Sequence, residues 1–377
     1  MPGGGSAPFP ATVGTADVDD LNDFLTATGW KTIYGVNFKT GTATNSAAEA
    51  QYVASKLGPR LYGFEVGNEI NFSGAWTAVK PKWESFANAV LAAAPNTKIV
   101  GPAAAESGLT TLTVPFAADE ASKLILLTQH HYQGQAGTGA ATVANLLAGD
   151  GTLVNVLKTV DGAATANHIP DGFRLGECNT LSHHGQDMVS NALASALWSI
   201  DFLFTNAMNG SSGVNFHGGQ LGMDASLPTL PFYYAPIQES NGAVTEAAPL
   251  FYGMLLFALG GTGNVLQTTA SAGTVNLGAY AIGAADGSTN VFVNNKDAAT
   301  AVTATVDLGA AVTAAAAIYL QGPTPVSLSA TTGVTIAGAP IEASGAWTPM
   351  APYALTVTGQ TVKVVVPPAS VALVHAH

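Results

Sequence analysis

Apolar and polar positions alternate with two different periods along the first two thirds of the chain. Six short runs are dense in apolar, strand-favouring residues, and they lie at 32–38, 60–69, 98–104, 123–132, 172–179 and 213–219. Between these runs, apolar residues recur three and four positions apart, which predicts helices over 48–58, 83–95, 143–160 and 189–210. The repeated order of strand, helix and strand predicts βα units around a parallel sheet.

The pattern changes after about residue 262, where the helical period ends. Short alternating segments rich in Thr and Val follow, separated by Gly and Pro, such as those at 274–283, 289–295, 300–309 and 362–368. Such a pattern is typical of an antiparallel β-sandwich. We therefore expect an α/β domain over residues 1–261 and a β-sandwich domain over residues 262–377.

Six predicted strands are fewer than the eight of a closed (β/α)8 barrel. An open, doubly wound sheet is the alternative architecture. However, no Gly-x-Gly-x-x-Gly turn follows the first strand, which removes the main support for a dinucleotide-binding domain. The predicted fold class is α/β, an incomplete (β/α)8 TIM-type barrel of about six strands followed by an antiparallel β-sandwich.

Charge is scarce in this chain, and acidic residues predominate. Only 10% of the 377 residues are charged, and 12 Lys and Arg against 24 Asp and Glu give a formal net charge of −12. This balance argues against nucleic acid and anionic membranes as partners. The longest apolar segment, 249–261, is too short to cross a bilayer and is predicted to form a buried helix.

Two features bear on the compartment in which the protein works. A single cysteine, Cys178, excludes an intrachain disulfide, and the first residues, MPGGGSAPFP, lack the basic and apolar regions of a signal peptide. The lysine-poor composition, rich in Ala, Thr, Gly and Ser, favours a secreted or periplasmic protein over a cytoplasmic one.

Two glutamates of this charge-poor chain stand at the ends of apolar runs. Glu69 ends LYGFEVGNE, and Glu177 ends FRLGE. In barrels the reacting groups lie at the carboxyl ends of strands, so we expect both on one rim. Two such carboxylates can flank a glycosidic bond, whereas a lone one more often stabilises the next helix through its dipole. Glu65 lies on the same strand face as Glu69, and we expect a structural role for it.

Longer stretches around these glutamates resemble family 79 of the retaining (β/α)8 glycoside hydrolases, which includes β-glucuronidases and heparanase-like enzymes. EVGNEINF (65–72) resembles the acid/base motif of that family. The stretch from RLGECNTLSHHG to GVNFHGG (174–219) is similar to its nucleophile strand, the following helix and the eighth strand. FYYAPI (232–237) and PLFYGMLLFALGG (249–261) resemble its approach to a terminal β-sandwich. The resemblance covers most of residues 20–265.

The resemblance implies a role for four residues. Glu69 would be the general acid/base and Glu177 the nucleophile, which requires unequal environments for the two carboxyl groups. Asn68 would form a hydrogen bond with the 2-hydroxyl of the sugar. Tyr132, at the end of the run QHHY, would hold the nucleophile carboxylate.

Other residues near the predicted strand ends are expected to contact the sugar. His130 and His131 face opposite sides of their strand and cannot chelate one metal ion together. No His-Glu-x-x-His spacing exists, so neither a metal site nor a cofactor is predicted. The expected substrate-binding residues, besides Asn68 and Tyr132, are His131, His183, His184, Gly185, His217, Tyr233, Tyr234 and Lys39.

The predicted function is that of a retaining glycoside hydrolase that cleaves β-glycosides of the uronic-acid, glucuronide type. One alternative is a carbohydrate-binding or scaffold protein that keeps the catalytic pair without turnover. A second alternative is the same chemistry on a neutral β-galactoside or β-xyloside. In each case the expected partner is an oligosaccharide or glycoside.

The resemblance also makes 32–38 the third barrel strand and 213–219 the eighth, so the first two strands have no counterpart. Unpaired strand edges at Val36 and Val214 are prone to associate with another chain unless something covers them. We expect either that the barrel side forms a homo-oligomer or that residues 1–18 lie along the gap.

Overall fold

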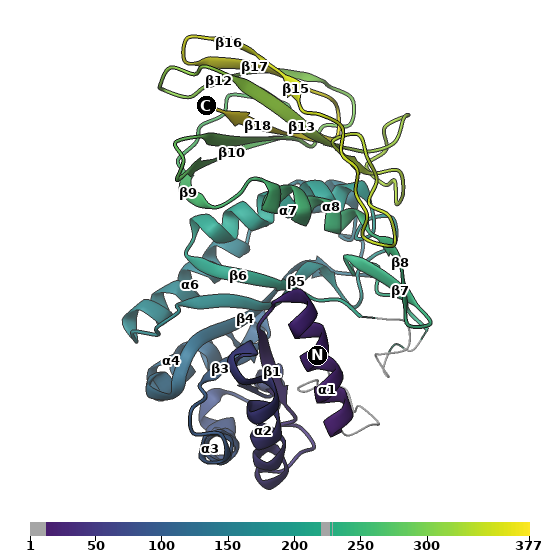
Figure 1. The fold of residues 1–377 in the computed structure, drawn as a ribbon. Coiled ribbons are helices and arrows are strands. Elements are labelled where there is room, and N and C mark those ends of the chain that lie inside the picture. Colours follow the sequence, from purple (N-terminus) through teal and green to yellow (C-terminus); the bar gives the residue numbers. More distant parts are fainter. Residues whose placement is uncertain (1–12, 220–226, 228) are drawn as a thin grey trace.

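Six parallel strands form the central sheet of the first part of the protein (Figure 1). The structure is a computed structural model, and it describes residues 13–219, 227 and 229–377. The strands follow one another in chain order, as β1 (Thr32–Val36), β2 (Leu61–Val66), β3 (Ile99–Ala104), β4 (Leu124–Gln135), β5 (Phe173–Ser182) and β6 (Ser211–Phe216). Within the described residues no ladder joins β1 to β6, so the sheet is a half-barrel with two edges. The prediction of an incomplete barrel of about six strands is confirmed.

Helices between the strands cover the outer face of the half-barrel (Figure 1). In α2, for example, the Thr42 side chain accepts a hydrogen bond from the backbone of Asn45, and the buried positions Ser46, Ala50, Val53 and Leu57 follow the helical period. The helices are α1 (Thr15–Thr28), α2 (Ala43–Leu57), α3 (Trp76–Ala93), α4 (Val114–Glu120), α5 (Val143–Leu147), α6 (Leu153–Ala166), α7 (Leu193–Met208) and α8 (Pro249–Leu259). Short 3-10 turns lie at Gly58–Arg60, Ile70–Ser73, Glu106–Gly108 and Ala121–Lys123, and a π turn at Leu109–Thr113.

One expected helix differs from the structure. The segment 143–160, predicted as one helix, forms two helices, α5 and α6. Gly149 lies between them with a φ of 97°, a backbone conformation that a continuous helix cannot contain. Of the segment 1–18 expected along the gap, residues 1–12 lie outside the described residues. The first described helix, α1, packs against α2, where Tyr52 donates a hydrogen bond to Asp19 at 2.8 Å.

The second part of the protein consists of antiparallel sheets, as predicted. A seven-stranded sheet has the order β14-β13-β18-β11-β10-β9, with β15 paired to β13, and a three-stranded sheet has the order β12-β17-β16. Buried residues of both sheets form one hydrophobic cluster, to which β17 contributes Val362, Val364 and Val366 with the period of two that a strand requires. The strands are β9 (Gly263–Leu266), β10 (Leu277–Ala284), β11 (Thr289–Asn295), β12 (Val302–Asp307), β13 (Ala315–Gln321), β14 (Thr335–Ile336), β15 (Tyr353–Ala354), β16 (Thr356–Thr358), β17 (Thr361–Val366) and β18 (Ser370–Ala376).

Helices α7 and α8 lie between the half-barrel and the seven-stranded sheet (Figure 1). The main hydrophobic core continues through them, since it contains Leu175 of β5, Leu197 of α7 and Phe292 of β11. Gly253 lets α8 approach α7, because a Cβ atom there would lie 2.0 Å from the Ser199 hydroxyl oxygen. The half-barrel and the seven-stranded sheet therefore share one hydrophobic core. The domain boundary expected between residues 261 and 262 stays a prediction.

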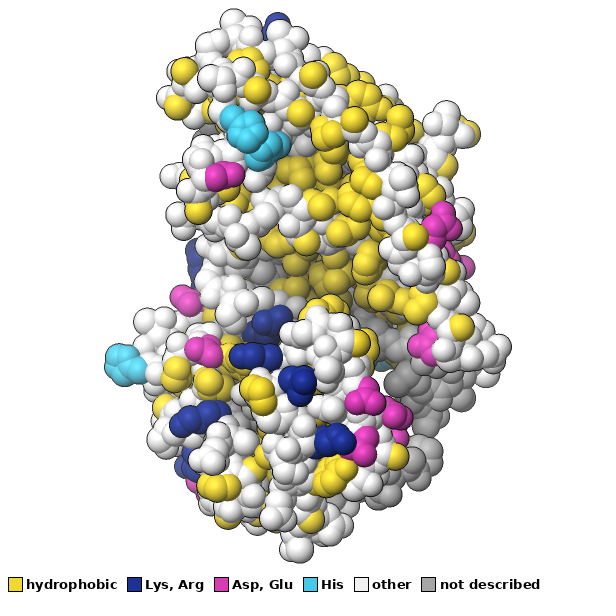
Figure 2. All heavy atoms as spheres, viewed as in Figure 1, with side chains coloured by type: hydrophobic (Ala, Val, Ile, Leu, Met, Phe, Trp, Pro, Cys, Tyr) yellow, Lys and Arg dark blue, Asp and Glu magenta, His cyan; other side chains and the backbone are white. Residues whose placement is uncertain are grey.

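One face of the molecule carries an apolar area across its middle, where α7 and α8 meet the antiparallel strands (Figure 2). On the same face, Lys and Arg side chains gather over the half-barrel (Figure 2). A separate hairpin, β7 (Ile237–Ser240) and β8 (Ala243–Ala247), lies between the half-barrel and α8 in the chain. Among the described residues, no helix is long and apolar enough to span a bilayer.

Candidate active site

The two glutamates expected to be catalytic approach each other: Glu69 follows β2, and Glu177 lies within β5. One carboxylate oxygen of Glu69, one of Glu177 and a ring nitrogen of His130 all lie within 4.8 Å of one another. Retaining glycosidases hold their two carboxyl groups about 5–5.5 Å apart, and inverting ones about 6.5–9.5 Å apart. The closest oxygens of the two glutamates therefore lie nearer to each other than the carboxyl groups of inverting enzymes do.

The backbone before Glu69 turns sharply to aim its side chain at Glu177. Glu69 itself has a left-handed φ of 48°, and its amide donates a hydrogen bond of 2.7 Å to the carbonyl of Ala103 on β3. Gly67 has a φ of 87°, and a Cβ atom there would lie 2.5 Å from the side chain of Ile70. Only glycine fits this position without strain, which explains the glycine of the Gly-Asn-Glu sequence.

His130 is the histidine that stands between the two carboxylates. Its Nδ1 lies 3.2 Å from Glu69 Oε1 and 3.8 Å from Glu177 Oε2, and its side chain is 3% exposed. Burial disfavours the charged ring, but the negative charges of Glu177, Glu69 and Glu65 outweigh it and raise the pKa of His130 to about 9. The ring is therefore a buried cation at neutral pH.

Glu177 is surrounded by groups that favour its ionised form. The hydroxyl of Tyr132 donates to Glu177 Oε1 at 2.7 Å, and His217 Nδ1 lies 3.4 Å from the same oxygen. Burial would raise the pKa of Glu177, but the charge of His130 and the Tyr132 hydrogen bond hold it below its ordinary value. A carboxylate that stays ionised is what a nucleophile requires.

His217 connects Glu177 to two tyrosines. Its Nδ1 lies 2.9 Å from the Tyr132 hydroxyl and 2.8 Å from the Tyr234 hydroxyl. Burial lowers the pKa of His217, so its ring is neutral at pH 7. Since Tyr132 donates its proton to Glu177, the neutral ring can accept the proton of Tyr234 at Nδ1 and keep its own proton on Nε2.

Glu65 lies behind the pair and is linked to it through Thr128. The Thr128 hydroxyl donates to Glu65 Oε1 at 2.6 Å and accepts the backbone amide of Ala103 at 2.9 Å. Burial raises the pKa of Glu65. These contacts connect β2, β3 and β4 beside Glu69 and Glu177, and they fit the structural role expected for Glu65.

His131 turns away from the carboxylate pair. Its Nε2 lies 2.6 Å from Asp150 Oδ2, and its Nδ1 lies 2.9 Å from Glu106 Oε2. Burial lowers the pKa of His131, but these two carboxylates raise it to about 9. Asp150 also accepts the backbone amides of Thr152 and Leu153 at the start of α6. His131 thus joins β4 to two loops, and the histidine beside the pair is its neighbour His130.

The loop after β5 reaches the site through Tyr234. The buried His184 stacks on Phe232 with ring centroids 3.8 Å apart, and its carbonyl accepts the backbone amide of Tyr234. A Cβ atom at Gly185 would lie 3.1 Å from that same amide nitrogen. His183 is exposed in this loop, and Tyr233 is half-buried beside Tyr234.

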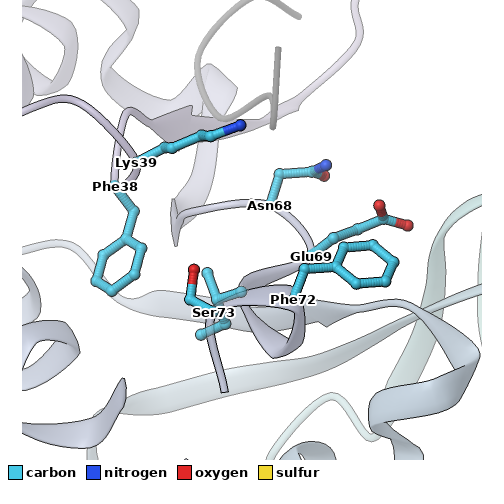
Figure 3. Close-up of a pocket in the computed structure, with 7 residues that line it drawn as sticks. Phe38, Lys39, Asn68, Glu69, Phe72 and Ser73 are labelled. Atoms are coloured by element: carbon cyan, nitrogen blue, oxygen red, sulfur yellow. The ribbon is translucent and has the colours of Figure 1, made fainter. Parts of the chain in front are cut away.

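A pocket of about 140 Å³ opens beside Glu69 (Figure 3). Figure 3 shows the side chains of Lys39, Asn68 and Glu69 pointing to the same side, with the Phe72 ring next to Glu69. Seven residues line the pocket, namely Phe38, Lys39, Asn68, Glu69, Ile70, Phe72 and Ser73. The structure therefore brings two of the expected substrate-binding residues, Lys39 and Asn68, to the acid/base candidate.

The same cluster contains the described residues that could hold a metal ion. Glu69, His130 and Glu177 each offer one donor atom within 4.8 Å of the others. A mixed set of one nitrogen and two oxygen ligands is compatible with a divalent transition metal or zinc. The expectation that the protein uses no metal stays a prediction.

No protein-family model matches the sequence, and no curated protein matches it. Solved structures are similar in fold. The 4-O-α-L-rhamnosyl-β-D-glucuronidase of Fusarium oxysporum 12S superposes with a TM-score of 0.79 at 17% identity, covering 99% of this chain and 84% of that one.

Two further structures extend the comparison to other specificities. The GH51 arabinofuranosidase of Xanthomonas axonopodis pv. citri gives a TM-score of 0.62 at 17% identity, with 95% of this chain and 78% of that one covered. A Paenibacillus polymyxa xyloglucanase of glycoside hydrolase family 44 gives 0.62 at 11% identity, with 96% and 83% covered. The fold is that of glycoside hydrolases, and the resemblance to family 79 in particular stays a prediction.

Proposed function

We propose that the protein is a retaining glycoside hydrolase that cleaves β-glycosides, with uronic-acid glycosides as its preferred class. The proposal rests on one observation: one carboxylate oxygen of Glu69, which follows β2, and one of Glu177, in β5, lie within 4.8 Å of each other, with a ring nitrogen of His130 within the same distance of both. The name of one structure of similar fold, a 4-O-α-L-rhamnosyl-β-D-glucuronidase, supports the uronic-acid class.

The two glutamates divide the chemistry between them. Glu69 donates its proton to the glycosidic oxygen while Glu177 attacks the anomeric carbon, so that the bond to the leaving group breaks and an ester forms on Glu177. The ionised Glu69 then takes a proton from water, which displaces Glu177 and restores the original anomeric configuration. Asn68 would bind the 2-hydroxyl during both steps.

Hydrolysis of a panel of 4-nitrophenyl β-glycosides tests this proposal. Glu177→Gln should abolish turnover, and Glu69→Gln should lower kcat by roughly 10²–10⁴-fold. The exposed Glu342→Gln is the matched control and should leave the rate unchanged. A 2-deoxy-2-fluoro glycoside should leave a sugar ester on the peptide that contains Glu177, detected by mass spectrometry. Product of inverted configuration in the proton NMR spectrum would contradict the mechanism.

The open side of the half-barrel favours a second candidate, a carbohydrate-binding protein without turnover, since no described ladder closes β1 onto β6. Calorimetric titration of the Glu177→Gln variant with the same glycosides separates the two. The second function would be favoured if the unmodified protein and the Glu177→Gln variant both bind the glycosides and the unmodified protein releases no 4-nitrophenol from them. Release that Glu177→Gln abolishes favours the hydrolase.

A further inference from the structure

The pocket of Figure 3 lies on one side of the catalytic pair. Glu69 is among its lining residues, and Glu177 is absent from that lining. In a retaining glycosidase the nucleophile lies under the sugar that is transferred, whereas the acid reaches the oxygen of the departing group. A pocket built around Glu69 therefore faces the departing group.

Phe72 offers this pocket a flat apolar face. It is 69% exposed, although it lies three residues after the acid/base candidate. Its backbone is fixed, because its amide donates to the Glu69 carbonyl at 3.0 Å within the turn Ile70–Ser73. The neighbouring Asn71 binds Ser107 and the amide of Ala105 at 3.1 and 2.9 Å. An exposed ring held on a rigid turn suits stacking against the C–H face of a sugar ring.

Lys39 gives the same pocket a positive charge. It follows β1, and Figure 3 shows its amine on the same side as the heads of Asn68 and Glu69. The preceding residue is anchored, because the carbonyl of Phe38 accepts the Lys82 amine at 2.7 Å, and that amine also lies 4.3 Å from the centroid of the Phe38 ring. In a chain of net charge −12, a cation at this place attracts an anionic group to one position.

We propose that this pocket is a leaving-group subsite that binds a sugar ring bearing an anionic substituent. Phe72 lies against the ring, and Lys39 pairs with the anion. The assignment rests on the proposed function, because the roles of Glu69 and Glu177 define which side is the leaving-group side. It moves Lys39 from the transferred sugar, where a uronate was expected, to the departing one.

Kinetics with one transferred sugar and three leaving groups tests the assignment. The transferred sugar is the one whose 4-nitrophenyl β-glycoside is cleaved fastest, and the leaving groups are 4-nitrophenol, glucose and glucuronic acid. Lys39→Met should lower kcat/KM for the glucuronic-acid leaving group about fivefold more than for the glucose one. Phe72→Ala should lower kcat/KM for both sugar leaving groups about tenfold more than for 4-nitrophenol.

Two matched variants control these measurements, the exposed Phe24→Ala on α1 and the exposed Lys158→Met on α6. Both should leave the ratios between leaving groups unchanged. Equal losses on all three leaving groups after Lys39→Met would place Lys39 on the transferred sugar and overturn the assignment. Unchanged ratios in both pocket variants would overturn it as well.

A binding measurement keeps this inference separate from the catalytic proposal. Methyl β-glucuronide is titrated calorimetrically into the Glu177→Gln variant and into the same variant carrying Lys39→Met. A Kd weakened about fivefold by Lys39→Met supports the anion site even where the unmodified protein shows no turnover. A Kd that Lys39→Met leaves unchanged, or no binding at all, overturns the anion site even where hydrolysis is demonstrated.

Discussion

Tyr132 donates its hydroxyl proton to the carboxylate of Glu177 at 2.7 Å, from the neighbouring barrel strand. A hydrogen bond to a charged group contributes about 1.5–3 kcal/mol. Tyr132→Phe removes this bond and should raise the pKa of Glu177 by about one unit or more. We therefore expect the acid limb of the kcat/KM profile to move to higher pH, measured with the best 4-nitrophenyl glycoside. The exposed Tyr353→Phe is the control, and an unmoved acid limb in Tyr132→Phe would contradict the assignment of Glu177 as nucleophile.

The cation of His130 predicts how stability depends on pH. Its pKa is about 9 in the folded protein, against 6.5 for the free side chain. Because folding raises this pKa, the contribution is complete below about pH 6.5 and is lost as the pH rises through about 9. The difference in free energy of unfolding between the native protein and His130→Gln should shrink by on the order of 3 kcal/mol over this window.

Urea denaturation at half-unit pH steps measures this difference. The pKa of His131 is also raised to about 9. We therefore expect the difference in free energy of unfolding between the native protein and His131→Gln to shrink over the same pH range. If the difference in free energy of unfolding between the native protein and His130→Gln grew with pH, it would contradict a charged His130 between the glutamates.

A buried ion pair fastens α7 to the seven-stranded sheet. Lys296 lies 2.5 Å from Asp201, and their side chains are 9% and 21% exposed. Asp201→Ala leaves this ammonium without its partner and should cost about 3–5 kcal/mol in free energy of unfolding. Lys296→Met should cost less, because Asp201 keeps hydrogen bonds from Asn294 and Tyr280 at 2.8 and 3.0 Å. Urea denaturation at pH 7 checks the order, and equal losses would contradict it.

The contact between α7 and α8 depends on Gly253. A methyl group there would lie 2.0 Å from the Ser199 hydroxyl and 2.5 Å from the Ala196 carbonyl oxygen. Gly253→Ala should therefore destabilise the protein by about 1–3 kcal/mol or more, measured by thermal unfolding. Gly162→Ala in α6 is the matched control, since nothing lies within 4 Å of its added methyl group. It should stabilise the helix by about 0.5–1 kcal/mol, and similar effects at both sites would be inconsistent with tight packing.

The strands of the half-barrel could be predicted because buried parallel strands are nearly continuous apolar runs. The residues at which these strands end could not be predicted in the same way. The run expected at 123–132 continues as β4 to Gln135, and that expected at 172–179 continues as β5 to Ser182, since these two strands remain paired with each other to their last residues. Pairing with a neighbour thus extends a strand into polar sequence that no apolar pattern predicts.

Two further features of the structure have a signal in the sequence. Side chains alternate along a strand, so placing Tyr132 in the site also places His130 there and turns His131 away. The hairpin of β7 and β8 turns at Asn241 and Gly242, with φ values of 52° and 76°, and Asn-Gly is a strong hairpin signal. The left-handed backbone of Glu69, by contrast, depends on contacts with β3 that only the folded protein supplies.

The core that runs from the half-barrel through α7 into the seven-stranded sheet has a consequence for folding. A chain divided near residue 262 would leave Phe204 of α7 without Phe292 and Tyr280, whose rings lie 4.9 and 4.5 Å from its own. Neither piece could then bury the apolar faces that it exposes to the other. Differential scanning calorimetry should show one cooperative heat-absorption peak for the whole protein, with the half-barrel around Glu69 and Glu177 and the antiparallel strands unfolding together.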